Sequence, residues 1–225
     1  MLSVKLISYS NSVNASGSTL QDLVCYCARV SNPSNQHNTE TNERLIKYLI
    51  KHKHWSPFEM ASVCLEITTT RDIARQILRH RSFSFQEFSQ RYADPTKDLS
   101  FTTRTARLQD PTNRQNSHEI TPMDGDHHLA VADEWLLRQK VLTAQINNLY
   151  QWAIQNDIAK EQARAVLPEG LTVSRMYMNG SLRSWIHYIE LRSGVETQKE
   201  HRIIARQCAE QISTVFPMIM DFVQQ

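Results

Sequence analysis

Alternation of apolar and polar residues marks two short stretches of the chain as strands. Apolar side chains fall loosely on every second position of 2–9, and Val63, Leu65 and Ile67 alternate with polar neighbours. A period of two is typical of a strand that buries one face. A third strand is predicted over 171–178.

Apolar residues spaced three and four positions apart cover most of the remaining chain and predict helices. Ser18 is the expected N-cap of a helix over 20–27, and Thr39 or Thr41 is the expected N-cap of the next helix. Trp55-Ser56-Pro57 ends that second helix, because proline cannot continue one. Further helices are predicted over 71–78, 128–156, 159–167, 181–191 and 197–216.

The longest predicted helix carries one apolar stripe, formed by Trp135, Leu142, Ile146, Leu149 and Ala153. Such a stripe predicts a scaffold helix that faces the core. A polar stretch with several prolines, about 94–126, precedes it and predicts a long excursion with little structure of its own. The order of the elements favours an α+β fold, with a small, mostly antiparallel sheet flanked by helices.

The bulk composition narrows the class of protein. The 225 residues suffice for a single domain with a substantial core, and the formal charge of +2 does not indicate a general nucleic-acid coat. Five glycines, with neither GxGxxG nor GxxxxGK[ST], make a Rossmann domain or a P-loop an unlikely choice. The four cysteines do not suggest a disulfide framework, and no signal peptide or membrane span is expected, so we expect a cytoplasmic protein.

The stretch RHRSFSFQEFSQRY, over 79–92, carries the densest chemistry of the chain. Arg71, Arg75 and Arg79 lie four positions apart just before and at its start, which predicts stacked cations on one helix face. Stacked cations repel one another, so an anion is expected against them. Arginine binds phosphate and stacks on planar rings, and the segment therefore predicts a flat, aromatic, phosphorylated ligand.

The same stretch resembles the signature of a known family. Arg79-His80-Arg81, followed after seven residues by Ser89, is similar to the RHR-x7-S signature of the flavin-dependent thymidylate synthases. Several ordered motifs are far more specific than one short motif. Further stretches resemble family motifs in family order: ARVS at 28–31, HWSPFE at 54–59, RLQD at 107–110, NRQN at 113–116, ARAVLP at 163–168, SLRSWIH at 181–187 and LR at 191–192.

The resemblance implies an enzyme that methylates dUMP to dTMP. Methylenetetrahydrofolate would supply the carbon, and FAD reduced by NADPH would supply the hydride. It also implies a homotetramer with active sites at subunit interfaces. A single catalytic domain over residues 1–225 is expected, with no metal, no nucleic acid and no membrane among its partners.

Family site residues carry over by position. Those implied for FAD are Ser31, His54, Ser56, Glu59, Arg79, His80, Arg81, Gln86, Glu87, Arg183 and His187. Those implied for dUMP are Gln76, Arg79, Glu87, Ser89, Arg91, Arg164 and Arg192. Arg192 matches the arginine credited with ionising the pyrimidine, and a fixed guanidinium beside developing negative charge is electrostatic catalysis.

This chain departs from the family pattern at a few positions. Met60 replaces the last histidine of the HxxPFEH motif, and Glu196 lies near the place of a late histidine. Gln86 stands where asparagine is common, and His187 stands where some members have asparagine. We expect the first two changes to alter local contacts on the flavin side.

Two other functions compete with the flavoenzyme. A nucleic-acid-binding module could use the arginines and aromatic residues of 71–92, although the balanced charge argues against it. A metal phosphohydrolase could use Asp124, Asp126, His127 and His128, but a solvated loop with an aspartate helix cap is the simpler interpretation.

Overall fold

A computed structural model describes residues 2–13, 17 and 19–224. The chain forms two compact units, each built from several segments. The α5 unit, named after its long helix, holds Thr68–Gln76 and Glu87–Arg175; the α7 unit holds Leu2–Ile67, Ile77–Gln86 and Met176–Gln225. Neither unit is one continuous stretch of sequence.

A four-stranded sheet confirms the α+β prediction. Its order is β1 (Ser3–Tyr9), β2 (Ser62–Thr70), β6 (Val173–Ser181) and β3 (Ser84–Glu87). The amide of Ser10 donates to Ser62 O, and the amide of Leu182 donates to Ala61 O, so the end of each strand lies beside the start of its neighbour and the pairs are antiparallel. Along β2, Val63, Leu65 and Ile67 are fully buried, as their alternation predicts. Strand β3 is not predicted from the sequence, because only four residues pair.

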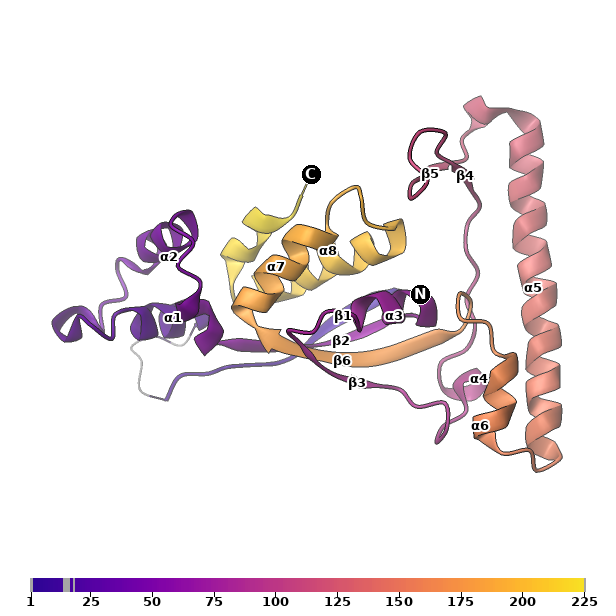
Figure 1. Ribbon diagram of the computed structural model, residues 1–225, viewed down its shortest axis with the longest axis horizontal. Coiled ribbons are helices and arrows are strands. Elements are labelled where there is room, and N and C mark those ends of the chain that lie inside the picture. Colours follow the sequence, from indigo (N-terminus) through magenta and orange to yellow (C-terminus); the bar gives the residue numbers. More distant parts are fainter. Residues whose placement is uncertain (1, 14–16, 18, 225) are drawn as a thin grey trace. The chain divides into compact units, whose positions relative to one another are not determined.

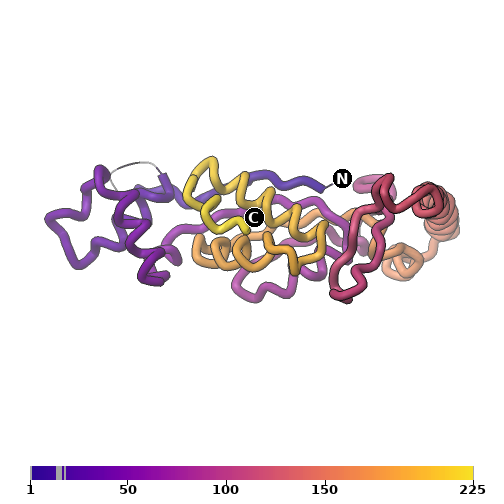
Figure 2. Tube along the Cα trace, turned by 90° about the horizontal axis from the view of Figure 1, so that it is seen from above, coloured from indigo at the N-terminus to yellow at the C-terminus, as the bar shows by residue number. Residues whose placement is uncertain are grey.

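The helices of the α7 unit are α1 (Leu20–Ala28), α2 (Asn42–Lys51), α7 (Leu182–Arg192) and α8 (Lys199–Ser213). Helices α7 and α8 lie side by side (Figures 1 and 2), and α8 also packs against β1. Trp185 of α7 is fully buried, and its indole Nε1 donates to Val63 O at 3.0 Å. This bond satisfies the polar end of a large core side chain, and it fixes α7 on β2.

The N-caps of α1 and α2 differ from the prediction. Thr19 caps α1 in a reciprocal capping box with Asp22, whereas the predicted cap, Ser18, lies outside the described residues. Thr41 precedes α2, but its side chain makes no capping bond. Its hydroxyl oxygen instead accepts a hydrogen bond from Arg29 Nη2 at 3.0 Å.

The α5 unit holds the 31-residue helix α5 (Gly125–Gln155), which stands beside the short helix α6 (Lys160–Ala163) in Figure 1. Tyr150, Ala153, Ala163 and Leu167 form its apolar cluster. The same unit contains α4 (Pro95–Asp98), the paired strands β4 (Arg107–Gln109) and β5 (Ser117–Glu119), and nearly all of α3 (Arg71–Ile77).

The prediction that the α5 stripe faces the core is wrong for three of its five residues. Trp135, Leu142 and Leu149 are 46%, 46% and 48% exposed. Of the other two, Ala153 belongs to the apolar cluster and Ile146 packs against it. The buried face of α5 lies further round the helix, where Gln139 and Tyr150 are almost or completely inaccessible. The spacing of apolar residues therefore predicted the helix correctly, but it did not predict which side of α5 the rest of the chain buries.

The excursion over 94–126 has more structure than predicted. Its β4–β5 pair is organised by Asp110, whose carboxylate accepts from the amides of Thr112 and Asn113 at 2.8 and 2.9 Å. The backbone hydrogen bond from Asn113 is the largest cause that lowers the pKa of Asp110. An aspartate that receives amide bonds two and three residues ahead is a turn-forming device, and it holds this loop together.

Candidate active site

The end of α7 meets the RHR turn in the α7 unit. Arg192 Nε donates to His80 Nε2 at 3.0 Å, so the ring hydrogen of the neutral histidine lies on Nδ1. Burial, followed by the charges of Arg192 and Arg79, lowers the pKa of His80 from 6.5 to about 4. His80 is therefore neutral near pH 7, and it holds the guanidinium of Arg192 without cancelling its charge.

Two buried residues with aromatic rings, Tyr188 and His201, lie next to His80. The rings of His80 and Tyr188 meet edge to face with centroids 5.0 Å apart, and the Tyr188 hydroxyl lies 3.1 Å from His201 Nε2. Burial is the main cause that lowers the pKa of His201 to about 3. The sequence prediction missed both residues. Tyr188 precedes Arg192 by one helical turn, and this spacing is the signal that could have found it.

Arg79 and Arg81 flank His80 and are exposed. Neither forms an ion pair with a carboxylate in the part of the chain that the structure describes. Two exposed guanidinium groups without internal partners are free to bind an anion. The three residues of the RHR triplet thus combine two open cations with one neutral imidazole.

Glu59 joins the HWSPFE motif to the start of α7. Its carboxylate accepts from Arg183 Nη1 at 3.0 Å and from Ser181 Oγ at 2.5 Å. Ser181 also caps α7, because its hydroxyl accepts from the amide of Ser184 at 3.3 Å. Ser181 is absent from the sequence-predicted site, although its position immediately before α7 could have indicated this role.

The other predicted flavin residues of this unit belong to the HWSPFE turn, contact it, or lie elsewhere in the unit. The Trp55 ring, between His54 and Ser56, lies 5.2 Å from the His187 ring, centroid to centroid. Ser56 lines a cavity of about 490 Å³ together with Val30 and Met60. Ser31 directly follows Val30 and is exposed, and Gln86 is exposed on β3.

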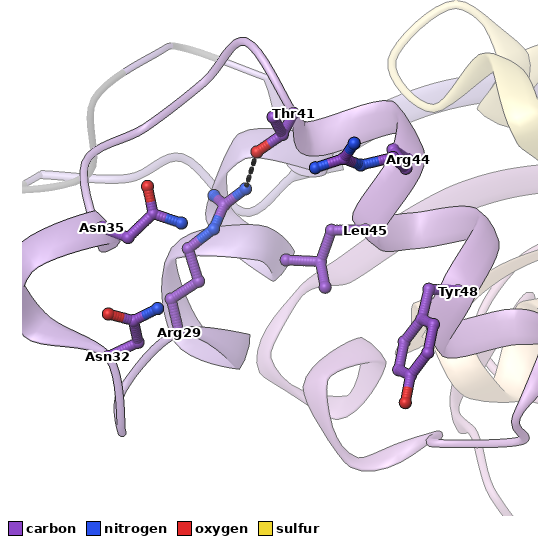
Figure 3. Close-up of a pocket in the computed structure, with 7 residues that line it drawn as sticks. All are labelled: Arg29, Asn32, Asn35, Thr41, Arg44, Leu45 and Tyr48. Carbon is purple, nitrogen blue, oxygen red and sulfur yellow. Dashed lines mark hydrogen bonds between the residues drawn. The ribbon is translucent and has the colours of Figure 1, made fainter.

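A second cavity of the α7 unit, about 350 Å³, lies beside Arg29, Arg44 and Tyr48 (Figure 3). The Arg29 side chain is almost fully buried, and its Nη1 donates to Asn38 O and Asn42 Oδ1, each at 2.6 Å. With its further bond to Thr41, Arg29 ties the 32–41 loop to α1 and α2. This arginine of the ARVS motif therefore has a structural function.

Three predicted nucleotide residues come together in the α5 unit. Arg91 Nη2 lies 3.7 Å from Glu161 Oε2, and Arg164 Nε donates to Glu161 O at 3.3 Å. Ser89 Oγ accepts from the Arg91 amide at 3.4 Å. Arg91 and Glu161 each expose 54% of their side chains, so the cluster is open to solvent. Glu161 is a member that the sequence prediction missed.

The anion expected beside the stacked arginines proves to be part of the chain itself. Arg75 Nε pairs with Glu169 Oε2 at 2.6 Å, and Arg71 lies 3.5 Å from both Glu169 and Glu87. Helix α3 ends at Ile77, so Arg79 does not continue its face and the prediction of three stacked cations is wrong. This neutralisation removes the main argument for a nucleic-acid surface on 71–92.

Glu87 and Gln76, both predicted to bind the nucleotide, are half-buried in the α5 unit. Glu87 Oε1 accepts from Ser174 Oγ at 2.7 Å in addition to its contact with Arg71. Within the described residues, no three side chains of histidine, cysteine, aspartate or glutamate gather at a spacing suited to a metal ion. Over the same residues, no helix combines the length and apolar character that a membrane crossing requires.

Comparison with known families decides the relationship. Residues 11–218 match the Thy1 family, described as thymidylate synthase complementing protein. The chain belongs to this family. The match covers most of the sequence, from before α1 to the segment after α8.

Curated relatives of this Thy1 chain include viral and bacterial proteins. A probable flavin-dependent thymidylate synthase of Paramecium bursaria Chlorella virus 1 is 47% identical over 218 residues, 97% of each chain. A flavin-dependent thymidylate synthase of Synechocystis is 46% identical over 200 residues, 88% of this chain and 87% of the relative. The UMP/dUMP methylase PolB of Streptomyces cacaoi shares the fold, with a TM-score of 0.78, 24% identity and coverage of 99% and 93%.

Proposed function

We propose that this protein is a flavin-dependent thymidylate synthase, which methylates dUMP to dTMP with methylenetetrahydrofolate as the carbon donor and NADPH as the reductant. The names of its relatives support this activity. The observation that carries the proposal is the contact between His80 of the RHR signature and Arg192 at the end of α7. Residues predicted for the cofactor and for catalysis thus meet, although 112 positions separate them.

The α7 unit offers features that suit FAD. The diphosphate of the cofactor requires cations, and Arg79 and Arg81 are exposed with no carboxylate partner in the described ranges. The cavity beside Ser56, Val30 and Met60 offers a largely apolar wall for a flat ring. A glycine-poor chain without a phosphate loop can therefore still bind a dinucleotide through side chains.

We assign FAD binding to the residues implied by the family. In the α7 unit these are Ser31, His54, Ser56, Glu59, Arg79, His80, Arg81, Gln86, Arg183 and His187. The family also implies Glu87, which belongs to the α5 unit. When bound, the reduced cofactor supplies the hydride. The protein contributes binding, orientation and charge. Glu59 orients Arg183 through their hydrogen bond and fixes the first turn of α7 through Ser181.

The cluster around Glu161 suits the phosphate of dUMP. Arg91 and Arg164 supply exposed guanidinium groups, and Ser89 supplies a hydroxyl. Phosphate would replace the weak, exposed pairing between Arg91 and Glu161, because a dianion offers arginine a stronger, bidentate partner. Gln76, Arg79, Glu87 and Arg192 complete the residues that we assign to the nucleotide.

Arg192 is the proposed catalytic residue. Its guanidinium would stabilise the negative charge that develops when the pyrimidine loses its N3 proton, which makes C5 more nucleophilic. His80 accepts one hydrogen from Nε and leaves the two Nη groups for substrate. Because His80 is neutral, the full charge of Arg192 remains available to the pyrimidine.

The proposal extends to assembly and location. We propose a homotetramer in the cytoplasm, with active sites at subunit interfaces. The half-exposed apolar side chains of α5 support an assembly of several copies, since a monomer rarely leaves such a surface open.

Release of tritium from [5-³H]dUMP tests the proposed reaction. We expect release that requires FAD, NADPH and methylenetetrahydrofolate together, and a purified protein with flavin absorbance. Omission of each component in turn is the control. A protein that binds FAD and dUMP but releases no tritium with all components present would contradict the assigned reaction.

A further inference from the structure

The outer side of α5 carries an apolar stripe that its own chain leaves uncovered. Residues spaced alternately four and three positions apart run along one side of the helix: Val131, Trp135, Arg138, Leu142, Gln145, Leu149 and Trp152. We call this set the outer stripe. Its five apolar members are 44% to 56% exposed. From Val131 to Trp152 the stripe extends about 32 Å along the helix.

The outer stripe differs from the face that α5 buries within its own unit. That buried face contains Gln139, Tyr150 and Ala153, which are 3%, 0% and 6% exposed. Gln139 is fully occupied there, because its amide exchanges hydrogen bonds with the backbone N and O of Arg104 at 2.8 and 2.9 Å. The helix is thus anchored on one side and offers two tryptophans and two leucines on another.

The outer stripe is self-complementary when the helix is reversed. Read from either end, its order is apolar, apolar, polar, apolar, polar, apolar, apolar, with Leu142 at the centre. Reversal about Leu142 brings Val131 onto Trp152 and Trp135 onto Leu149. It also brings Arg138 onto Gln145. A two-fold symmetric contact requires this property, because each residue of one copy must fit the residue that lies opposite it in the other copy.

The polar members of the outer stripe allow it to be covered. Arg138 is its only charged residue, and its Nε already pairs with Glu134 Oε1 at 2.7 Å on the preceding turn. A partner helix would therefore cover a charge that keeps its counterion, which avoids the large cost of an unpaired buried charge. Beside the stripe, Trp135, Leu142 and Leu171 line a cavity of about 310 Å³, which provides room for a side chain of the partner.

We infer that α5 packs antiparallel against α5 of a second copy of this chain, with the two-fold axis at or next to Leu142. Trp135 of each copy then lies opposite Leu149 of the other, beside the cavity that Trp135 lines. The inference rests on the outer stripe and not on the proposed chemistry. It adds to the proposed tetramer a specific surface, symmetry and register.

Cysteine cross-linking at the predicted axis tests the register. In a background with Cys27→Ser and Cys64→Ser, which removes the two partly accessible thiols, Leu142→Cys is treated with oxidant or a short bismaleimide. A residue on a two-fold axis faces its own copy, so we expect covalent dimers in high yield. Ala144, which is also exposed, lies on the opposite side of the helix. Ala144→Cys is therefore the matched control and should remain largely uncross-linked.

Light scattering with the full-length chain tests the stripe itself. Leu142→Glu places a charge at the centre of the contact, and we expect at least about a tenfold rise in the dissociation constant of the dimer. Ala144→Glu should leave association unchanged, and circular dichroism verifies the helix in both variants. A wild-type monomer, or equal cross-linking at 142 and 144, would overturn the inference. If Leu142→Cys cross-links as expected but the wild-type protein makes no thymidylate, the result would count against the proposed function alone.

Discussion

The arginines of the two units have different partners. In the α5 unit, Arg71, Arg75 and Arg91 each lie within 4.0 Å of a carboxylate, and the partners are Glu87, Glu169 and Glu161. In the α7 unit, Arg192 is bound to a neutral histidine, and Arg79 and Arg81 have no carboxylate partner within the described ranges. Arg183, which pairs with Glu59, is the exception.

This difference shows which arginines retain their charge for a ligand. An internal carboxylate neutralises an arginine and lets it support the fold, as Glu169 does for Arg75. A neutral acceptor orients a guanidinium without neutralising it, as His80 does for Arg192. The α7 unit therefore holds positive charge ready for anionic groups. In the α5 unit a ligand must compete with glutamates.

Removal of Arg192 should have the largest effect on activity. Arg192→Ala deletes a cation that a neutral histidine orients without cancelling its charge. We expect a loss of about 10²–10³ in turnover, the usual effect of removing one electrostatic donor. FAD should remain bound, which the flavin absorbance of the purified variant reports. Arg44→Ala, an exposed arginine on α2, is the matched control. Unchanged tritium release from Arg192→Ala would show that the assigned role is wrong.

The buried histidines predict a dependence of stability on pH. Native pKa values of about 4 for His80 and about 3 for His201 lie below the ordinary 6.5, so the unfolded chain binds more protons as pH falls. Their stabilising effect is complete above pH 6.5 and is lost as the pH falls toward 4. We expect a slope of about 1.4 kcal/mol per pH unit for each histidine.

Urea unfolding between pH 7.5 and 4 measures this slope. His201→Phe, which retains the buried aromatic volume, should show a shallower decline than the wild type. A wild-type free energy of unfolding that does not change over the range would mean that neither histidine is held neutral.

Arg79 tests whether an unpaired arginine is a ligand site. Arg79→Ala should weaken retention of FAD or dUMP by about tenfold or more, since a hydrogen bond to a charged group contributes about 1.5–3 kcal/mol. Titration calorimetry with each ligand measures the change. Arg79→Lys keeps the charge and should recover part of the affinity. Wild-type affinity for both ligands in the alanine variant would leave this arginine without a binding role.

Substitution of Glu161 should give the smallest effect, and the direction of the change in dUMP affinity shows whether Glu161 competes with the phosphate. Glu161→Gln removes the carboxylate beside Arg91, and an exposed pair of this kind contributes about 0–1 kcal/mol. We expect dUMP to bind up to about fivefold more tightly, as measured by calorimetry at low salt. Weaker binding would mean that Glu161 supports the nucleotide site and does not compete with its phosphate.

Elements with a strong local pattern could be predicted from the sequence. The alternation of Val63, Leu65 and Ile67 predicts β2, and Ser181 precedes a helix that ends at Arg192, close to the predicted end. The motif residues of the candidate site could also be assigned by position. Such features depend on neighbours a few positions away, which the sequence displays directly.

Features that depend on distant partners could not be predicted. The stripe of Trp135, Leu142 and Leu149 has the period of a core-facing helix, yet its own chain covers a different side of α5. The arginines at 71 and 75 predict an anion, but nothing local indicates that Glu169 supplies it. Tyr188 and His201 likewise gain significance only because both pack beside His80.

The sequence was enough to predict the family, the helices and strands with clear periods, and the set of side chains that we propose for flavin and nucleotide binding. The tertiary structure alone decided which charges remain available. Arg192 meets His80 across 112 positions, and Arg75 meets Glu169 across 94. Period and spacing express interactions between near neighbours, whereas the strength of a charge depends on burial and on partners that only the folded chain brings together.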